Sequence, residues 1–263
     1  MRGRQEARDT REGNKARAGE LDPQETPEGR RLAINGDPSR GRWIGLVSLA
    51  YVIGVMLGDG GVYGRSYTVF CRDRNRSFVQ AVAGMAGKIF GVEPRIRRAS
   101  PNCWMASTNH KKVHGVLIKL GYPRGRKLTN LSIPPRFVED PEDRMEILRG
   151  LFDAEGYCGL DVQRHGEKTY EYPYVGIDMI ARPLIKQVQG ILEDLGIESS
   201  VLVKRPRARG RNPQLSLVIK GAERVRRFAD LIGFRHPEKS EKLRRLVEGG
   251  SSETIRQAPR EAG

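Results

Sequence analysis

Two stretches of the sequence, AYVIGVMLGDGG (50–61) and EILRGLFDAEGY (146–157), follow one pattern. Each is an apolar run with helical periodicity, and each ends in an acid followed by glycine. The acids are Asp59 in the first stretch and Glu155 in the second. Because the pattern occurs twice in one chain, we interpret the protein as a duplicated unit.

Both stretches also carry small residues four positions apart. These are Gly54 and Gly58 in the first stretch, and Gly150 and Ala154 in the second. Residues at this separation share one helix face, and small side chains there allow two helix backbones to come close. We therefore expect the two helices to pack against each other and to bring both acids to one place.

The repeat continues beyond these helices. An amphipathic run passes through glycine into an extended segment in FVQAVAGMAGKIFGVEPRIRR (78–98) and in LIKQVQGILEDLGIESSVLVKR (184–205). A third pair of helices, KKVHGVLIKLGY (111–122) and AERVRRFADLIGF (222–234), ends in glycine and an aromatic residue. Glycine after a periodic run is the usual helix C-cap. Each half is thus predicted as helix, two strands, helix, two strands, helix, with longer hairpins in the second half.

Alternation along the predicted strands places apolar side chains on one face only. Val175 and Ile177 share a face within 172–180, and PQLSLVI (213–219) alternates in the same way. Helices should cover this face and leave the other open. Arg95 and Arg97 flank Ile96, so the open face is expected to be positively charged.

The charged ends of the chain differ from its middle. Residues 1–43 and 249–263 lack apolar periodicity and are expected to be disordered tails. Their formal charges are +2 and 0, so the segment 44–248 retains +13 of the +15 total. We divide this segment into a first domain with linker (44–138) and a second domain (139–248). A body this basic should bind a polyanion, although a generic RNA-associated protein would show the same charge.

The composition also excludes some classes of protein. The sequence contains no apolar run of membrane-spanning length and no secretory signal at its start. The three cysteines match no zinc-ligand spacing. We expect an intracellular protein with no membrane partner, cytoplasmic and associated with the nucleoid if the host is prokaryotic.

The position of the two acids suggests a cation site. The C-terminal end of a helix is the negative end of its dipole, which disfavours an acid, yet the sequence places one there twice. Two carboxylates brought together would repel unless a cation lay between them. Mg²⁺ prefers oxygen ligands and can activate water for phosphodiester hydrolysis. The alternative to a cation site is that each acid simply lies in an ordinary turn after a helix. This alternative is reasonable for either acid alone, but it does not explain why both acids occupy matched positions of the repeat.

The segments VIGVMLGDG (52–60) and LRGLFDAEG (148–156) resemble the two motifs of the LAGLIDADG homing endonucleases. The resemblance covers about 44–248 and implies an α+β fold of two pseudo-symmetric αββαββα units. Saddle-shaped antiparallel sheets would grip DNA, with the motif helices at the interface of a monomer. It further implies that Asp59 and Glu155 are the catalytic acids that bind a divalent metal, Mg²⁺. Gly58 and Ala154 would contribute backbone carbonyls to the metal.

Two positions depart from the family pattern. The sixth position of the first motif is Leu57, where an acid is common, whereas Asp153 retains the acid in the second motif. Many members also place a lysine near the second acid, but Tyr157 and Cys158 follow it here. We therefore assign Arg72 as a possible contributor to the solvent network of the site.

Arginine and lysine residues on strands and loops are the predicted DNA contacts. Arginines on strands can read guanine in the major groove, whereas loop arginines more often hold phosphates. Any single one could instead be a solvated surface charge. The candidates are Arg72, Arg74, Arg95, Arg97, Lys204, Arg205, Arg207, Arg209 and Arg211.

The resemblance leaves more than one function open. The main hypothesis is an intron-encoded, metal-dependent endonuclease that cuts both strands of a long, asymmetric double-stranded DNA site. The alternative is an RNA maturase, which binds intron RNA on the same fold. A transcription regulator of this fold would need a further helix-turn-helix domain. An intein is not expected, because no splicing Cys or Ser opens the sequence and no His-Asn pair closes it.

Overall fold

A computed structural model describes residues 48–63, 66–125, 129–166, 168–204 and 212–249, and the short strand β9 (Arg256–Gln257). The predicted tail 1–43 lies outside these residues. Of the predicted tail 249–263, only Gly249 and β9 are described. Strand β9 pairs with β6 of the second half.

The first half forms a four-stranded antiparallel sheet in the order β1-β2-β4-β3. Helices precede, interrupt and follow the strands, as the repeat predicts. The elements are α1 (Leu49–Asp59), β1 (Gly60–Tyr63), β2 (Thr68–Asp73), α2 (Arg76–Phe90), β3 (Arg95–Ser100), β4 (Cys103–Thr108) and α3 (Lys111–Lys119).

The second half repeats this architecture. Its main strands lie in the order β5-β6-β8-β7, which is the order of the first sheet with each strand replaced by its repeat partner. The predicted α+β fold of two repeated units is therefore confirmed. The elements are α4 (Arg136–Glu139), α5 (Pro141–Glu155), β5 (Gly156–His165), β6 (Lys168–Met179), α6 (Arg182–Asp194), β7 (Ser200–Lys204), β8 (Gln214–Lys220), α7 (Ala222–Leu231) and α8 (Pro237–Gly249).

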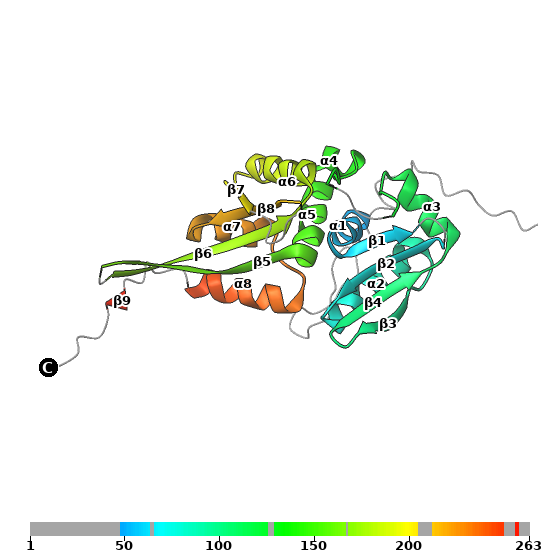
Figure 1. Cartoon of the computed structure of the whole chain (residues 1–263), viewed down its shortest axis with the longest axis horizontal. Coiled ribbons are helices and arrows are strands. Elements are labelled where there is room, and N and C mark those ends of the chain that lie inside the picture. The colour runs from blue at the N-terminus through cyan, green and yellow to red at the C-terminus, as the bar shows by residue number, and fades with distance from the viewer. Residues whose placement is uncertain are drawn as a thin grey trace, which may run out of the picture.

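The motif helices α1 and α5 lie side by side between the two sheets (Figure 1). The side chain of Ser48 accepts a hydrogen bond at the start of α1, and that of Asp140 does so at the start of α5. The small residues predicted to allow close packing lie at the contact. A methyl group at Gly54 would overlap the carbonyl of Ile147, and one at Gly150 would overlap the carbonyl of Tyr51. The two backbones therefore touch, as the sequence predicts.

The glycines predicted to end the other helices do so in the left-handed conformation that favours glycine. The φ angles are +64° at Gly91, +87° at Gly121, +69° at Gly196 and +60° at Gly233. Each glycine turns the chain away from its helix toward the next element. The repeat thus extends to the stop signals of the helices.

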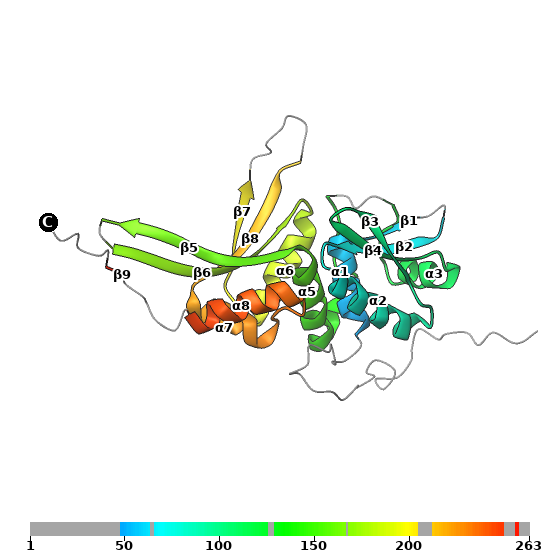
Figure 2. The ribbon, with the colours of Figure 1, turned by 90° about the horizontal axis from the view of Figure 1, so that it is seen from below.

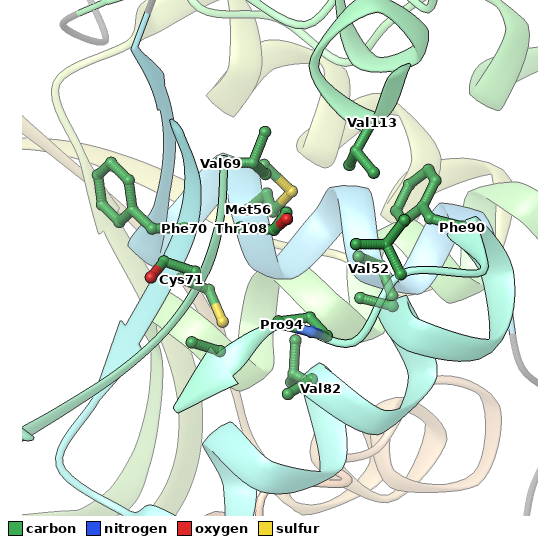
Figure 3. A pocket seen from close by; sticks show the side chains of 15 residues that line it. Val52, Met56, Val69, Phe70, Cys71, Val82, Phe90, Pro94, Thr108 and Val113 are labelled. Atoms are coloured by element: carbon green, nitrogen blue, oxygen red, sulfur yellow. The ribbon is translucent and has the colours of Figure 1, made fainter. Parts of the chain in front are cut away.

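Helices cover one face of each sheet and leave the other open, as Figure 2 shows. On the covered face of the second sheet, Val175, Ile177 and Leu217 are fully buried. In the first half, a cavity of about 40 Å³ lies between the sheet and its helices (Figure 3). Val52 of α1 and Val82 of α2 are among its lining residues. Predominantly apolar side chains surround this space, so it belongs to the core and not to a polar site.

The second half differs from the first in two ways. Its first hairpin is longer, because β5 and β6 have 10 and 12 residues whereas β1 and β2 have 4 and 6. This hairpin projects away from the rest of the protein (Figures 1 and 2). The second half also continues into α8, which the repeat does not predict. No helix within the described ranges is long and apolar enough to span a membrane.

Candidate functional site

The two predicted acids are the last residues of the motif helices. Asp59 ends α1 and Glu155 ends α5, and the chain passes directly from each into a strand. Both side chains are half-buried. A methyl group at Gly58 would lie 2.9 Å from Cγ of Glu155, so the end of α1 touches the side chain at the end of α5. The helix interface therefore brings the two predicted motif positions together.

Lys239 of α8 lies at the same place, and sequence reasoning did not identify it. Its ammonium group donates hydrogen bonds to the carbonyl oxygens of Asp153 at 2.6 Å and Ala154 at 2.8 Å. A longer bond of 3.4 Å reaches the carbonyl of Phe152. These carbonyls belong to the last turn of α5, where the helix leaves carbonyls to be satisfied from outside, although that of Phe152 also accepts the N–H of Gly156. Lys239 thus places a basic group at the end of α5, whereas Tyr157 and Cys158 follow Glu155 in the sequence.

The charge of Lys239 interacts with both acids. Burial lowers the pKa of its ammonium group, while nearby carboxylates act in the opposite direction. Asp59 and Glu155 are both among these carboxylates. Asp59 also contributes, after burial, to the raised pKa of the Cys71 thiol, which is about 12. One cation therefore lies within electrostatic reach of both predicted catalytic acids.

The donor groups fit a hard divalent ion that retains water. Within the residues that the structure describes, no group of three or more His, Cys, Asp or Glu side chains could hold a metal. Two carboxylates and helix-end carbonyls would leave several positions for water and for substrate phosphate. Mg²⁺ is bound in this manner in phosphoryl-transfer sites. The Ala154 carbonyl, predicted to be a metal ligand, would share its oxygen with Lys239.

Asp153, the acid at the sixth position of the second motif, holds parts of the fold together through buried hydrogen bonds. Its side chain is fully buried, and it accepts a hydrogen bond of 2.7 Å from the Tyr51 hydroxyl of α1. It also accepts the backbone N–H groups of Arg235 and His236 at 2.9 Å each. Burial raises the pKa of this carboxyl group. Asp153 therefore fixes the segment before α8 against the interface.

Helix α8 also contacts the first half of the protein. The ring of His236 lies 3.4 Å from a carboxylate oxygen of Asp73. Two residues later, Glu238 accepts a hydrogen bond of 2.8 Å from the side chain of Asn75. These contacts and those of Asp153 lie on both sides of the interface. They hold the start of α8, and with it Lys239, at the ends of both motif helices.

The open face of the first sheet carries three of the predicted arginines. Arg72 of β2 and Arg97 of β3 both lie opposite Met105 of β4, and Arg95 lies opposite Ser107. All three arginines are exposed. The guanidinium group of Arg72 stacks 4.7 Å from the ring centre of Phe70, on the same face. Arg74 is exposed in the turn after β2.

The open face of the second sheet carries a polar network that the sequence did not predict. The Tyr157 hydroxyl lies 2.9 Å from Asp178 and 3.0 Å from Ser216. Lys204, a predicted DNA contact, pairs with Asp178 at 2.7 Å. Strand register assembles this group, because Gly156 pairs with Ile177, and Tyr157 and Asp178 are the residues that follow these two partners. Four other predicted contacts, Arg205, Arg207, Arg209 and Arg211, lie outside the described residues.

Comparison with known proteins supports this architecture. Residues 142–233 match the LAGLIDADG-like domain family. The homing endonuclease I-ApeI of Aeropyrum pernix is 26% identical over 207 residues, which cover 76% of this chain and 87% of I-ApeI. Elongation factor 2 of Methanopyrus kandleri is 26% identical over 215 residues, but these cover 80% of this chain and only 15% of that protein.

A solved structure has the same fold. The crystal structure of I-DmoI in complex with DNA and Ca superposes with a TM-score of 0.53 at 16% identity. The superposition covers 74% of this chain and 95% of I-DmoI. Because the identity is low, this likeness establishes the fold alone. Together with the family match and the likeness to I-ApeI, it confirms the resemblance that the two motifs indicate.

Proposed function

We propose that this chain, which has the LAGLIDADG fold of homing endonucleases, hydrolyses phosphodiester bonds in both strands of a long, asymmetric DNA site. The observation that carries the proposal is that the ends of α1 and α5, which carry Asp59 and Glu155, pack against each other. An open sheet face lies on each side of this point (Figure 2). The site thus combines paired acids with two surfaces that can follow a duplex.

Each part of the site has a separate role in the proposal. A bound Mg²⁺ ion would polarise a phosphate and activate water. Asp59 and Glu155 would hold divalent ions, each serving one strand. The close contact at Gly54 and Gly150 fixes the distance between the acids, because neither backbone can move without breaking the interface. Lys239 keeps positive charge at the end of α5, where the helix dipole is negative.

Unequal hairpins support an asymmetric target. The β5–β6 hairpin extends well beyond its counterpart β1–β2, so the second half can contact more base pairs than the first. A single chain with two unequal faces would read two unequal half-sites as a monomer. I-ApeI, which is similar over most of its length, is named a homing endonuclease.

Selection from a DNA library tests this function. Purified protein is incubated with Mg²⁺ and circular plasmids that carry randomised or genomic inserts. Some plasmids should become linear, and their ends should share one long sequence. Omission of the divalent ion should prevent cleavage. A failure to linearise any plasmid, together with tight binding to intron RNA, would instead support a maturase.

The arginines of β3 allow a quantitative prediction for DNA binding. Replacing both Arg95 and Arg97 with alanine should weaken DNA binding at least tenfold. If both hold phosphates, the slope of log affinity against log salt should fall by roughly 2, because each lost phosphate contact contributes about 0.9. Fluorescence anisotropy without divalent ions measures both quantities.

Arg98 is the matched control for this experiment. It lies on the opposite face of the same strand, and its guanidinium group donates a hydrogen bond to the Pro101 carbonyl at 3.1 Å. Arg98→Ala should leave affinity and slope unchanged. Equal effects of the Arg98 and Arg95/Arg97 substitutions would show that β3 does not present its open face to DNA.

A further inference from the structure

The open faces of the two sheets present their cations in different ways. Arg72, Arg95 and Arg97 of the first face are exposed, and none of them pairs with a carboxylate in the part of the chain that the structure describes. On the second face, Lys204 and Lys220 each form an ion pair with an aspartate. The first face therefore presents guanidinium charge to a polyanion, whereas these two lysines are already neutralised.

The pair of Lys204 and Asp178 is held by its neighbours. Lys204 of β7 reaches across β8 to Asp178 of β6, and the two charged atoms lie 2.7 Å apart. Asp178 also accepts a hydrogen bond of 2.9 Å from the Tyr157 hydroxyl, which in turn lies 3.0 Å from Ser216. Burial alone would raise the pKa of Asp178, but hydrogen bonds from Lys204, Ser216 and Tyr157 lower it below its usual value. The carboxylate is therefore charged, and residues of three other strands fix its position.

A second pair repeats this arrangement farther along the projecting hairpin. Lys220 of β8 reaches across β6 to Asp161 of β5, and Asp161 also accepts a hydrogen bond of 3.0 Å from Gln163. The ammonium group of Lys220 lies 5.0 Å from the ring centre of Tyr172, which pairs with Asp161 across the strands. Both ion pairs thus cross one strand of the open face, so the face carries little net positive charge at these positions.

We infer that Asp161 and Asp178 are specificity-determining residues, which keep the lysines of the second sheet from holding DNA by its phosphates. A phosphate that approaches either lysine also meets the carboxylate, so attraction and repulsion largely cancel. A base edge behaves differently, because the amino group of cytosine can donate a hydrogen bond to a carboxylate in the major groove. The face therefore binds a matching sequence in preference to the backbone alone. These roles rest on the proposed function, which places the second sheet on one half of a DNA site.

Binding of the full-length protein to a duplex of unrelated sequence, without divalent ions, tests these roles. Asp178→Asn frees Lys204, so affinity at about 0.1 M salt should rise about fivefold, and the slope of log affinity against log salt should steepen by about 0.9. The double variant Asp178→Asn/Lys204→Gln keeps the net charge and should match the wild type in both quantities. A double variant whose slope is shallower by about 0.9 would show that Lys204 already holds phosphate, and would overturn the inference.

Asp194→Asn is the matched control for the change in net charge. It breaks the pair with Arg144 at the end of α6, on the helix side of the second sheet, and should leave the slope unchanged. Asp161→Asn, alone and together with Lys220→Gln, should reproduce the results expected for Asp178. This second pair keeps the test decisive if Asp178→Asn does not fold. Equal slopes for the Asp161, Asp178 and Asp194 variants would contradict the inference.

Selection of cleaved sites separates these roles from the proposed function. With Asp178→Asn, base preference should relax in one half-site only, chiefly where the wild type selects cytosine. The ratio of affinities for the selected and the unrelated duplex should fall at least fivefold, and an unchanged ratio would show that Asp178 takes no part in discrimination. If the wild type cuts no DNA, the proposed function fails. The salt slopes, or elution from heparin if no duplex is bound, still decide whether the two aspartates neutralise the lysines.

Discussion

Double-strand cleavage should fall at least about 1,000-fold when Asp59 is replaced by Asn or Glu155 by Gln, which corresponds to about 4 kcal/mol of transition-state stabilisation. Each substitution removes a negative charge without changing the size of the side chain. The lost charge is one that would hold the divalent ion at the helix ends. Plasmid linearisation under single-turnover conditions measures the effect, with the site obtained by library selection.

Two further measurements separate this effect from a loss of folding or binding. DNA affinity should stay the same or increase, because removal of a negative charge favours a polyanion. The thermal midpoint should change little, since both acids are half-buried at helix ends. Asp194→Asn, at the exposed end of α6 beside Arg144, is the matched control and should cleave normally. If either acid variant cleaves within tenfold of the wild type, the acid at that position is not catalytic.

Gly150→Ala should lower the free energy of unfolding by about 3 kcal/mol, the upper end of the usual cost of overpacking. The added methyl group would overlap the Tyr51 carbonyl and lie 2.9 Å from the Val55 nitrogen. Both atoms are backbone atoms of α1, so no side chain can move aside. The helices would have to separate along the whole contact. Urea denaturation measures the change, and the cleavage rate should fall with it because the acids move apart.

Gly190 of α6 is the matched control for this substitution. It also lies inside a helix, but a methyl group there would meet nothing within 4 Å. Gly190→Ala should therefore stabilise the protein by roughly 0.5 to 1 kcal/mol, through helix propensity alone. The two substitutions are chemically identical and are expected to have opposite signs. A stabilising effect of Gly150→Ala would show that α1 and α5 do not pack as the structure has them.

Structural features whose sequence signals occur in both halves of the chain could be predicted from the sequence. The glycines of the motif helices and the acids after them occur twice, so each copy supports the interpretation of the other. The stop signals at Gly91 and Gly196 also repeat, and they fix where each second helix ends. Such local patterns predict the order of helices and strands along each half once the duplication is recognised. The fold and the position of the two acids follow from these patterns.

Features that arise only from tertiary contact could not be predicted. Among the described residues of the first half, no helix of similar length follows α3 as α8 follows α7, and the lysines of α8 at 239 and 242 look alike in the sequence. Only the packing of α8 against β5 and α7 shows that Lys239 meets the end of α5. Asp153 likewise has the sequence position of a motif acid. Its role depends on Tyr51 and His236, which come from distant parts of the chain.

Strand register decides the network on the open face of the second sheet. Tyr157, Asp178 and Ser216 belong to three different strands, and a shift of one residue would move them to opposite faces. Alternation in the sequence identified the apolar face correctly but gave no pairing between strands. The polar partners of Lys204 therefore follow only from the pairing of the strands in the assembled sheet.

The ends of α1 and α5 should form one site for divalent ions. Paramagnetic broadening of backbone amide signals by Mn²⁺ tests it most directly, because it locates even a weakly bound ion. At the lowest Mn²⁺ concentrations, the signals of residues 58–61 and 154–157 should broaden together, and Asp59→Asn should reduce the broadening at both segments. Broadening that begins elsewhere, or at only one of the two segments, would contradict the account.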